Sequence, residues 1–271
     1  SSALQRILAE HRAGTARVDL VNANVVGDLL KAGLAQKFHS PILAAYPKED
    51  LDPRGITGNL RYSYHGVAAW NTNLVKSAEA PKTYDDLLNP KWKGKLIGTD
   101  SFETGLPYLI TYMSVVRGQK KALDYAEKLS KQKVKVSSAS LRNVVDLMAA
   151  GEHTMIVNPA VHHIGQAKGK GAPVEASMAG PVISRPGYFT MLTNAPHPHA
   201  AMLLIDFLLT KDVGKIVSKA KYFPAHPDVD PIKDMKAYTP KAQGLKKIVL
   251  TDDIVEKHYK RSAEIFKKYF Q

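Results

Sequence analysis

Segments with helical spacing of apolar residues alternate with short apolar runs along most of the chain. The helical spacing predicts helices over residues 3–14, 26–34, 105–118, 119–131, 137–151, 199–210 and 252–270. The short runs predict strands over 18–23, 62–73, 95–99, 133–136, 154–157 and 188–192. Residues 40–60, rich in Pro, Gly and Asp, and the segment with two histidines that follows residue 157 are predicted as loops. Alternation of this kind indicates an α/β architecture.

Two of these strands run into a turn rich in hydroxyl groups or glycine that opens a helix. The turns lie in 97-IGTDSFETGLPY-108 and 134-VKVSSASLRN-143. Helix N-termini have unpaired N–H groups and a positive dipole end, so two of them at one crevice would bind an anion, with Thr104 and Gly105 at one and Ser140 at the other. Taken alone, each turn is explained by ordinary capping. Arg142 lies in a first turn, where a cation opposes the dipole, so we expect another contact to offset that cost.

Composition limits the partners and the classes of site. The 271 residues are 44% hydrophobic and carry a formal charge of +13, without cysteine. A chain of this length can bury a core and form two lobes, and the charge favours anionic ligands, nucleic acid or an acidic membrane, or serves solubility alone. Thiolate metal sites are excluded. The longest apolar run, 200–209, contains Asp206 and is too short for a bilayer span.

Motifs typical of enzymes are missing from the sequence. It contains no phosphate-binding G-x-x-x-x-G-K-[ST] loop, no G-x-G-x-x-G after a strand, no H-E-x-x-H and no G-x-S-x-G. A hydrolase would need a nucleophile and base at recognisable spacing, and a nucleic-acid-binding module would need basic residues clustered with stacking aromatics, whereas the lysines here are scattered over helix faces. We therefore expect no enzyme and no nucleic-acid partner.

Four stretches resemble the periplasmic solute-binding proteins of bacterial ABC importers, particularly the ferric-iron-binding branch. They are 66-GVAAWNTNLV-75, 81-PKTYDDLLNPKWKGKL-96, 151-GEHTMIVNP-159 and 195-APHPHAAMLLIDFLLTKDVGKIV-217. The resemblance implies a type II periplasmic-binding-protein fold, in which two α/β lobes hold the ligand in a cleft and close by hinge motion. It further implies a periplasmic protein that delivers its ligand to an inner-membrane ABC permease and catalyses nothing. We expect a monomer without a resident cofactor.

The resemblance also predicts the domain limits. The first lobe would comprise 1–72, the second 73–182, and the chain would return to the first lobe over 183–225, leaving 226–271 as a helical segment packed on the lobes. The strands 64–71 and 182–189 would cross between lobes. Members of the family begin with a β-α-β unit before the helix that opens this sequence, so that unit is expected to be missing here, and any targeting segment to have been removed.

Two adjacent histidines lie where the ferric branch has its tyrosine pair. Phenolate is a hard anionic donor for ferric ion, whereas His162 and His163 are neutral donors suited to divalent metals. Asn24 similarly stands near a carboxylate ligand common in that branch. A polar turn at the cleft edge explains the histidines equally well, and in extended chain only one of them would face the cleft. The crossing-strand tyrosines Tyr62, Tyr64 and Tyr188 could supply a phenolate, although aromatics in strands are usually core.

The sequence therefore predicts the binding component of an importer for a small anionic or anion-bearing solute. Ferric ion with a synergistic anion is the alternative, in which case the transported metal would be bound through His162 or His163. The predicted ligand-binding residues are Asn24, Thr104, Gly105, Ser140, Arg142, Asn158, His162 and His163. Hydroxyl and backbone N–H groups would donate to the ligand, and Arg142 would pair with its charge.

Overall fold

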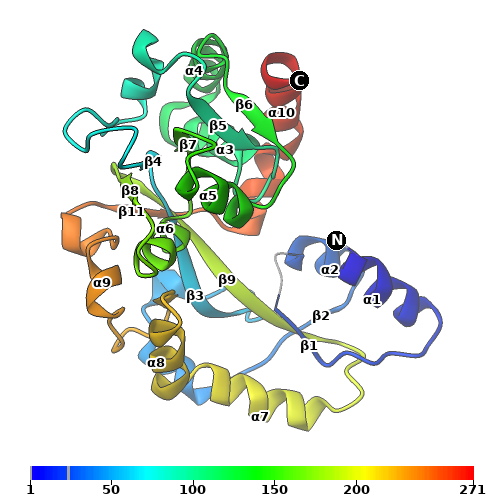
Figure 1. Ribbon diagram of the computed structural model, residues 1–271. Coiled ribbons are helices and arrows are strands. Elements are labelled where there is room, and N and C mark those ends of the chain that lie inside the picture. Colours follow the sequence, from blue (N-terminus) through cyan, green and yellow to red (C-terminus); the bar gives the residue numbers. More distant parts are fainter. Residues whose placement is uncertain (1, 23–24) are drawn as a thin grey trace. The chain divides into compact units, whose positions relative to one another are not determined.

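The computed structural model describes residues 2–22 and 25–271, and the chain divides into two compact units (Figure 1). Unit 1 comprises Ser1–Tyr62 and Pro186–Ile232, and unit 2 comprises Ser63–Arg185 and Lys233–Gln271. The chain thus changes unit inside the strands β3 (Gly58–His65) and β9 (Val182–Leu192), and again before Lys233. The sequence placed these changes at residues 72, 182 and 225, and it put the first crossing in 64–71.

Unit 1 contains residues 58–62 of β3 and residues 186–192 of β9. In it β9 pairs antiparallel with β1 and β2, and β3 pairs antiparallel with β10. Apolar residues of α1, α2 and the strands form its core, among them Leu4, Ile7, Leu29, Leu34 and Leu192. The elements of this unit besides β3 and β9 are α1 (Ser2–Arg12), β1 (Leu20–Val21), α2 (Val26–Lys31), β2 (Ala35–Gln36), η1 (Pro41–Ala45), η2 (Lys48–Asp50), α7 (Pro198–Leu208), α8 (Lys211–Lys219) and β10 (Phe223–Pro224).

Unit 2 contains a five-stranded sheet in the order β6-β5-β7-β4-β8. In it β5 pairs parallel with β6 and with β7, whereas β4 pairs antiparallel with β7 and β8. Helices, short 3-10 turns and a further strand complete this unit. The elements of this unit besides β3 and β9 are β4 (Ala68–Asn71), η3 (Asp85–Leu88), η4 (Pro90–Trp92), β5 (Leu96–Thr99), α3 (Leu106–Arg117), α4 (Gln119–Ser130), β6 (Lys135–Ser137), α5 (Leu141–Ala149), β7 (Met155–Val157), α6 (Val161–Lys168), β8 (Val174–Ser177), α9 (Lys233–Lys236), η5 (Lys241–Gln243), β11 (Lys247–Val249) and α10 (Asp252–Phe270).

The sheet of unit 2 is apolar on both faces, and helices cover each face (Figure 1). Leu96 packs with α3, α4 and α10, while its neighbour Ile97 packs with α5 and α6. Met155 and Ile156 of β7 divide in the same way. Successive residues of a strand point to opposite faces, so a strand buried on both faces has a continuous apolar run, as 154–157 does.

Several predicted elements have the predicted type with altered limits. The helix predicted over 137–151 begins at Leu141, because Ser140 caps it by accepting the N–H of Asn143 at 3.2 Å. The strand predicted over 18–23 is confined to Leu20–Val21. Residues 85–92 form two 3-10 turns instead of one helix, since Pro90 cannot donate a backbone hydrogen bond.

Within the described residues, every helix is too short or too polar to cross a lipid bilayer.

Candidate functional site

Three helices of unit 2 begin at the same edge of its sheet. Because β6, β5 and β7 are parallel neighbours, their carboxyl ends share one edge, and α5, α3 and α6 follow them directly (Figure 1). Ligands of parallel α/β sheets bind outside the carboxyl ends of the strands. The two turns that the sequence singled out, before α3 and α5, therefore lie at this edge, and a third helix N-terminus joins them.

Gly105 is the N-cap of α3, and only glycine fits there. A Cβ built on Gly105 would lie 2.1 Å from the carbonyl oxygen of Thr99 and 2.5 Å from its Oγ1. No side chain caps this helix end, and Pro107 in the first turn has no N–H. The first backbone N–H of α3, that of Leu106, has no acceptor within the helix. An N–H group in this position is a candidate donor to a bound anion.

The loop before α3, residues 100–105, is held in place by contacts from four other segments. Ser138 Oγ donates to Asp100 Oδ2 at 2.6 Å. The ring of Phe102 lies 4.5 Å from that of Tyr259 on α10, between centroids. Glu103 Oε2 accepts a hydrogen bond from Arg185 Nη2 of β9 at 2.9 Å. The loop is thus positioned before any ligand binds.

The fourth of these contacts comes from Asn158, which follows β7 and is fully buried. Its Nδ2 donates to the carbonyl oxygens of Thr104 at 3.2 Å and Gly105 at 3.4 Å, and its own N–H donates to the carbonyl of Val67 at 3.1 Å. The backbone of Asn158 is left-handed, with φ 56°. Asparagine tolerates this conformation better than most residues, and strain of this kind is concentrated at functional sites.

His65 lies behind Asn158 at the end of β3. Its Nδ1 lies 3.3 Å from the carbonyl oxygen of Asn158, and since a carbonyl only accepts, Nδ1 carries the hydrogen. Burial, against the opposing effect of the hydrogen bond to Asn158 and with smaller contributions from Arg185 and His163, lowers the pKa of His65 to about 3. His65 is therefore neutral, and its Nε2 is an acceptor.

Three buried polar atoms in this region have no hydrogen-bond partner within the described residues. They are His65 Nε2, Asn158 Oδ1 and Thr99 Oγ1. Buried polar groups are nearly always paired with protein, water or ligand, so their concentration beneath one helix N-terminus indicates a place for polar atoms from outside the chain.

Arg142 lies in the first turn of α5, and its guanidinium contacts two side chains. Nη1 donates to Oε1 of Gln166 on α6 at 2.5 Å, and Nε lies 3.6 Å from the Asp146 carboxylate one turn along α5. These contacts offset the unfavourable position of a cation at a helix N-terminus. Whether Arg142 also contacts a ligand stays a prediction.

The prediction that the histidines lie in a loop is wrong, because residues 161–168 form α6. Ile164 and Ala167 are buried against α5, and this packing stabilises a helix that the sequence reasoning overlooked. His162 is buried, His163 is half-buried, and their ring centroids lie 4.1 Å apart. The argument that adjacent residues point to opposite faces of an extended chain therefore does not apply to them.

The remaining candidates from the sequence are Asn24 and the tyrosines of the crossing strands. Asn24 lies outside the described residues. Tyr62 is buried beside β10, and Tyr64 and Tyr188 are partly exposed. The described residues contain no group of three or more His, Asp or Glu side chains that could hold a metal ion. The sequence reasoning missed Thr99, His65 and Arg185; the signal for Thr99 was its place as the last residue of a buried strand.

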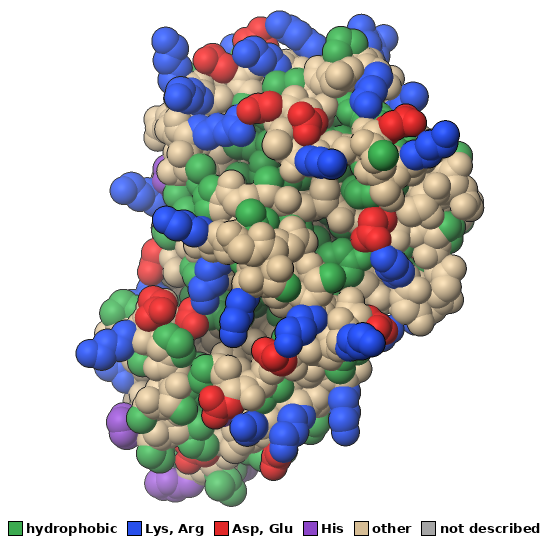
Figure 2. Space-filling model, turned by 90° about the vertical axis from the view of Figure 1, so that its left-hand side faces the viewer, with side chains coloured by type: hydrophobic (Ala, Val, Ile, Leu, Met, Phe, Trp, Pro, Cys, Tyr) green, Lys and Arg blue, Asp and Glu red, His purple; other side chains and the backbone are tan. Residues whose placement is uncertain are grey.

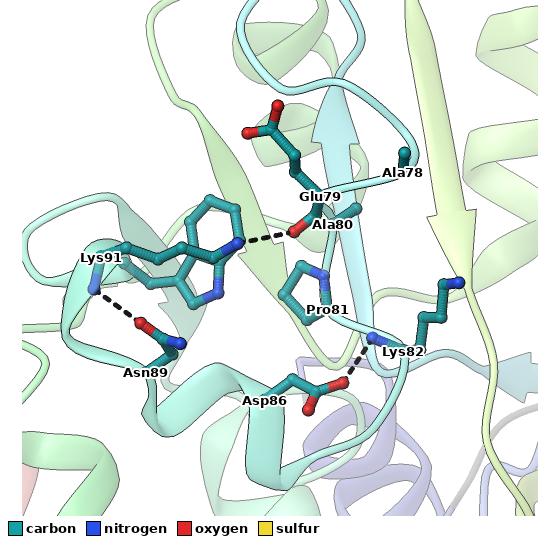
Figure 3. Close-up of a pocket in the computed structure, with 9 residues that line it drawn as sticks. Ala78, Glu79, Ala80, Pro81, Lys82, Asp86, Asn89 and Lys91 are labelled. Atoms are coloured by element: carbon teal, nitrogen blue, oxygen red, sulfur yellow. Dashed lines mark hydrogen bonds between the residues drawn. The ribbon is translucent and has the colours of Figure 1, made fainter.

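A pocket of about 290 Å³ lies elsewhere in unit 2, between residues 78 and 92 (Figure 3). The Asp86 carboxylate at its rim accepts the backbone N–H of Lys82 at 2.9 Å and of Thr83 at 2.8 Å. Lys91 Nζ donates to the carbonyl of Glu79 at 3.0 Å. The polar groups of the pocket thus form hydrogen bonds within the loops that line it. These bonds give the Pro- and Lys-rich stretch 81–96 a structural role.

Comparison with solved structures shows the same fold in periplasmic binding proteins. The periplasmic binding protein P5PA is 23% identical, with a TM-score of 0.79 over 100% of this chain and 88% of that one. AfuA from Actinobacillus pleuropneumoniae, solved with fructose-6-phosphate, is 20% identical, with a TM-score of 0.79 over 99% and 86%. The Trichodesmium protein IdiA (FutA), solved with iron and citrate, is 18% identical, with a TM-score of 0.80 over 99% and 88%. These likenesses confirm the predicted two-lobed type II fold.

A comparison with curated protein sequences found no significant match. The family model described as "Bacterial extracellular solute-binding protein" matches residues 18–243, which is most of the chain. The resemblance noted in the sequence is thereby confirmed, and the chain belongs to the family of bacterial extracellular solute-binding proteins.

Proposed function

We propose that this protein is the periplasmic binding component of an ABC importer, which captures a small anionic or anion-bearing solute and delivers it to the permease. Membership of the family supports a solute ligand and a permease partner. The protein would need no catalytic residues, because binding and release are its whole task.

The observation that carries the proposal is the shared position of three helix N-termini at one edge of the unit 2 sheet. The N-termini of α3, α5 and α6 each contribute a positive dipole end, equivalent to roughly half an elementary charge. Thr104, Gly105, Ser140, Asn158, His162 and His163 lie at or next to these ends. An anion placed there would receive backbone and hydroxyl hydrogen bonds from three elements.

Neighbouring structures suggest the first compounds to try. AfuA was solved with fructose-6-phosphate and the Trichodesmium protein with iron and citrate, so phosphate esters and organic acids both occur on this fold. A thermal-shift screen of the purified protein should include sugar phosphates, inorganic phosphate, citrate and metal ions. A ligand present at 100 times its Kd should add about 2.7 kcal/mol to the free energy of unfolding. Stabilisation by uncharged solutes alone would contradict the proposal.

Ferric ion with a synergistic anion is the second candidate, supported by the iron and citrate in the Trichodesmium structure. The adjacent His162 and His163 would have to replace phenolate donors, although imidazole is the softer ligand. We expect protein purified with ferric citrate to be colourless and to retain no stoichiometric iron. A red protein with one tightly bound iron would favour this candidate over the anion alone.

A further inference from the structure

Resting on the proposed function, we propose that Arg185 is the residue that receives the negative charge of the ligand, and that Glu103 occupies its guanidinium until the ligand arrives. The ligand would be a small phosphate or carboxylate, the two groups whose geometry matches the planar guanidinium fork. Neither residue was singled out by the sequence.

The burial of the two partners is unequal. The Arg185 side chain is 13% exposed, whereas that of Glu103 is 56% exposed, and their atoms lie 2.9 Å apart. A guanidinium withdrawn this far from water requires an anion beside it. An exposed carboxylate gains little from the same contact, because water replaces its partner at small cost. The Glu103 carboxylate therefore loses little when a ligand anion takes its place beside Arg185.

The surroundings of Arg185 suit an anion. Glu103 belongs to the 100–105 loop, which leads directly into the N-terminus of α3. Through its 2.9 Å hydrogen bond to Glu103, the Arg185 guanidinium lies beside this loop. An incoming phosphate or carboxylate would meet the guanidinium and the helix dipole together.

Displacement of Glu103 would leave the loop in place. Asp100 is held by Ser138, Phe102 by Tyr259, and the carbonyls of Thr104 and Gly105 by Asn158. The Glu103 side chain can accordingly rotate into solvent while the backbone that offers its N–H groups to the ligand stays fixed. The carboxylate acts as an internal competitor of the ligand.

Arg142 is the other candidate for binding the negative charge of the ligand, since it too lies at the sheet edge where the helices begin. Its side chain is 32% exposed and is paired with Asp146 on its own helix and with Gln166. Because Arg142 is more exposed to water and has a carboxylate one helix turn away, a ligand anion would stabilise it less than it would stabilise Arg185.

Calorimetric titration of six variants, Arg142→Ala among them, with fructose 6-phosphate, inorganic phosphate and citrate tests the proposal. We expect Glu103→Gln to tighten binding about tenfold, and Arg185→Gln to weaken it at least about 30-fold, equal to about 2 kcal/mol at 1.4 kcal/mol per tenfold change. Arg185→Lys keeps the charge without the fork and should fall between parent and Arg185→Gln. Asp85→Asn and Arg117→Gln, which break a second Arg–carboxylate pair of unit 2 with a 2.7 Å contact, are matched controls and should bind within twofold of the parent.

The outcomes separate the two proposals. Parent protein that binds none of the three anions would overturn both this inference and the proposed function. Parent that binds an anion while Glu103→Gln and Arg185→Lys stay within twofold of it would overturn the inference alone, and these two variants decide the matter even if Arg185→Gln does not fold. A large loss in Arg142→Ala without one in Arg185→Gln would assign the charge to Arg142 instead.

Discussion

Asn158 combines a left-handed backbone with a side chain that donates to two carbonyl groups of the 100–105 loop. We expect Asn158→Gly to lower the free energy of unfolding by about 1–2 kcal/mol, because glycine accepts the positive φ but leaves both carbonyls without their donor. Asn158→Ala should cost about 1 kcal/mol more, since its Cβ is strained at this φ. Urea denaturation measures both, and equal losses would show that the backbone carries no strain.

His65 should make the stability of the protein depend on pH. Burial lowers its pKa to about 3 from an ordinary value of 6.5, so between these values the unfolded chain binds a proton that the folded protein does not. Stability is unaffected by His65 above pH 6.5 and falls as the pH drops below it, by about 2 kcal/mol at pH 5. Urea denaturation at pH 7 and pH 5 should show a loss that is smaller by this amount in His65→Gln. An unchanged loss would mean that His65 titrates normally.

At the scale of elements, the C-terminal helix α10 is an integral part of unit 2. Ile265 and Phe266 are buried in the core shared with α3 and α4, and Ser262 shares a buried hydrogen bond of 2.8 Å with Thr111 of α3. We expect Ile265→Ala to lower the free energy of unfolding by about 2–5 kcal/mol, through lost apolar burial and a cavity. Lys260→Ala, at an exposed position of the same helix, should change it by less than about 0.5 kcal/mol. Similar effects for the two variants would contradict this packing.

At the scale of the whole molecule, the protein carries a formal charge of +13. Figure 2 shows Lys and Arg side chains spread over the face in view, with Asp and Glu between them. Such a charge repels itself and also draws small anions towards the protein. Raising the ionic strength from about 10 mM to about 150 mM shortens the Debye length from about 30 Å to about 8 Å.

We therefore expect the free energy of unfolding to rise by about 0.5–1 kcal/mol over this range of NaCl, because repulsion within the folded protein is screened. Urea denaturation at the two salt concentrations measures the change. A fall in stability would instead show that favourable pairs such as Arg117 with Asp85 outweigh the repulsion.

The sequence by itself determined the elements whose information is local. The helices α3, α4 and α10 and the strands β5 and β7 follow from apolar spacing. The stretches that resemble solute-binding proteins likewise identified the family. These features depend on residues within a few positions of one another, so a single sequence suffices to reveal them.

Only the tertiary structure decided how distant residues meet at the sheet edge. Arg185 contacts Glu103 across 82 positions, and His65 contacts Asn158 across 93. The helix α6 also escaped the sequence reasoning, because it depends on packing between elements. The pairing of β5 with β6 and β7 fixes which residues share an edge, and that register is set by the burial of whole sheet faces, which no short stretch of sequence contains.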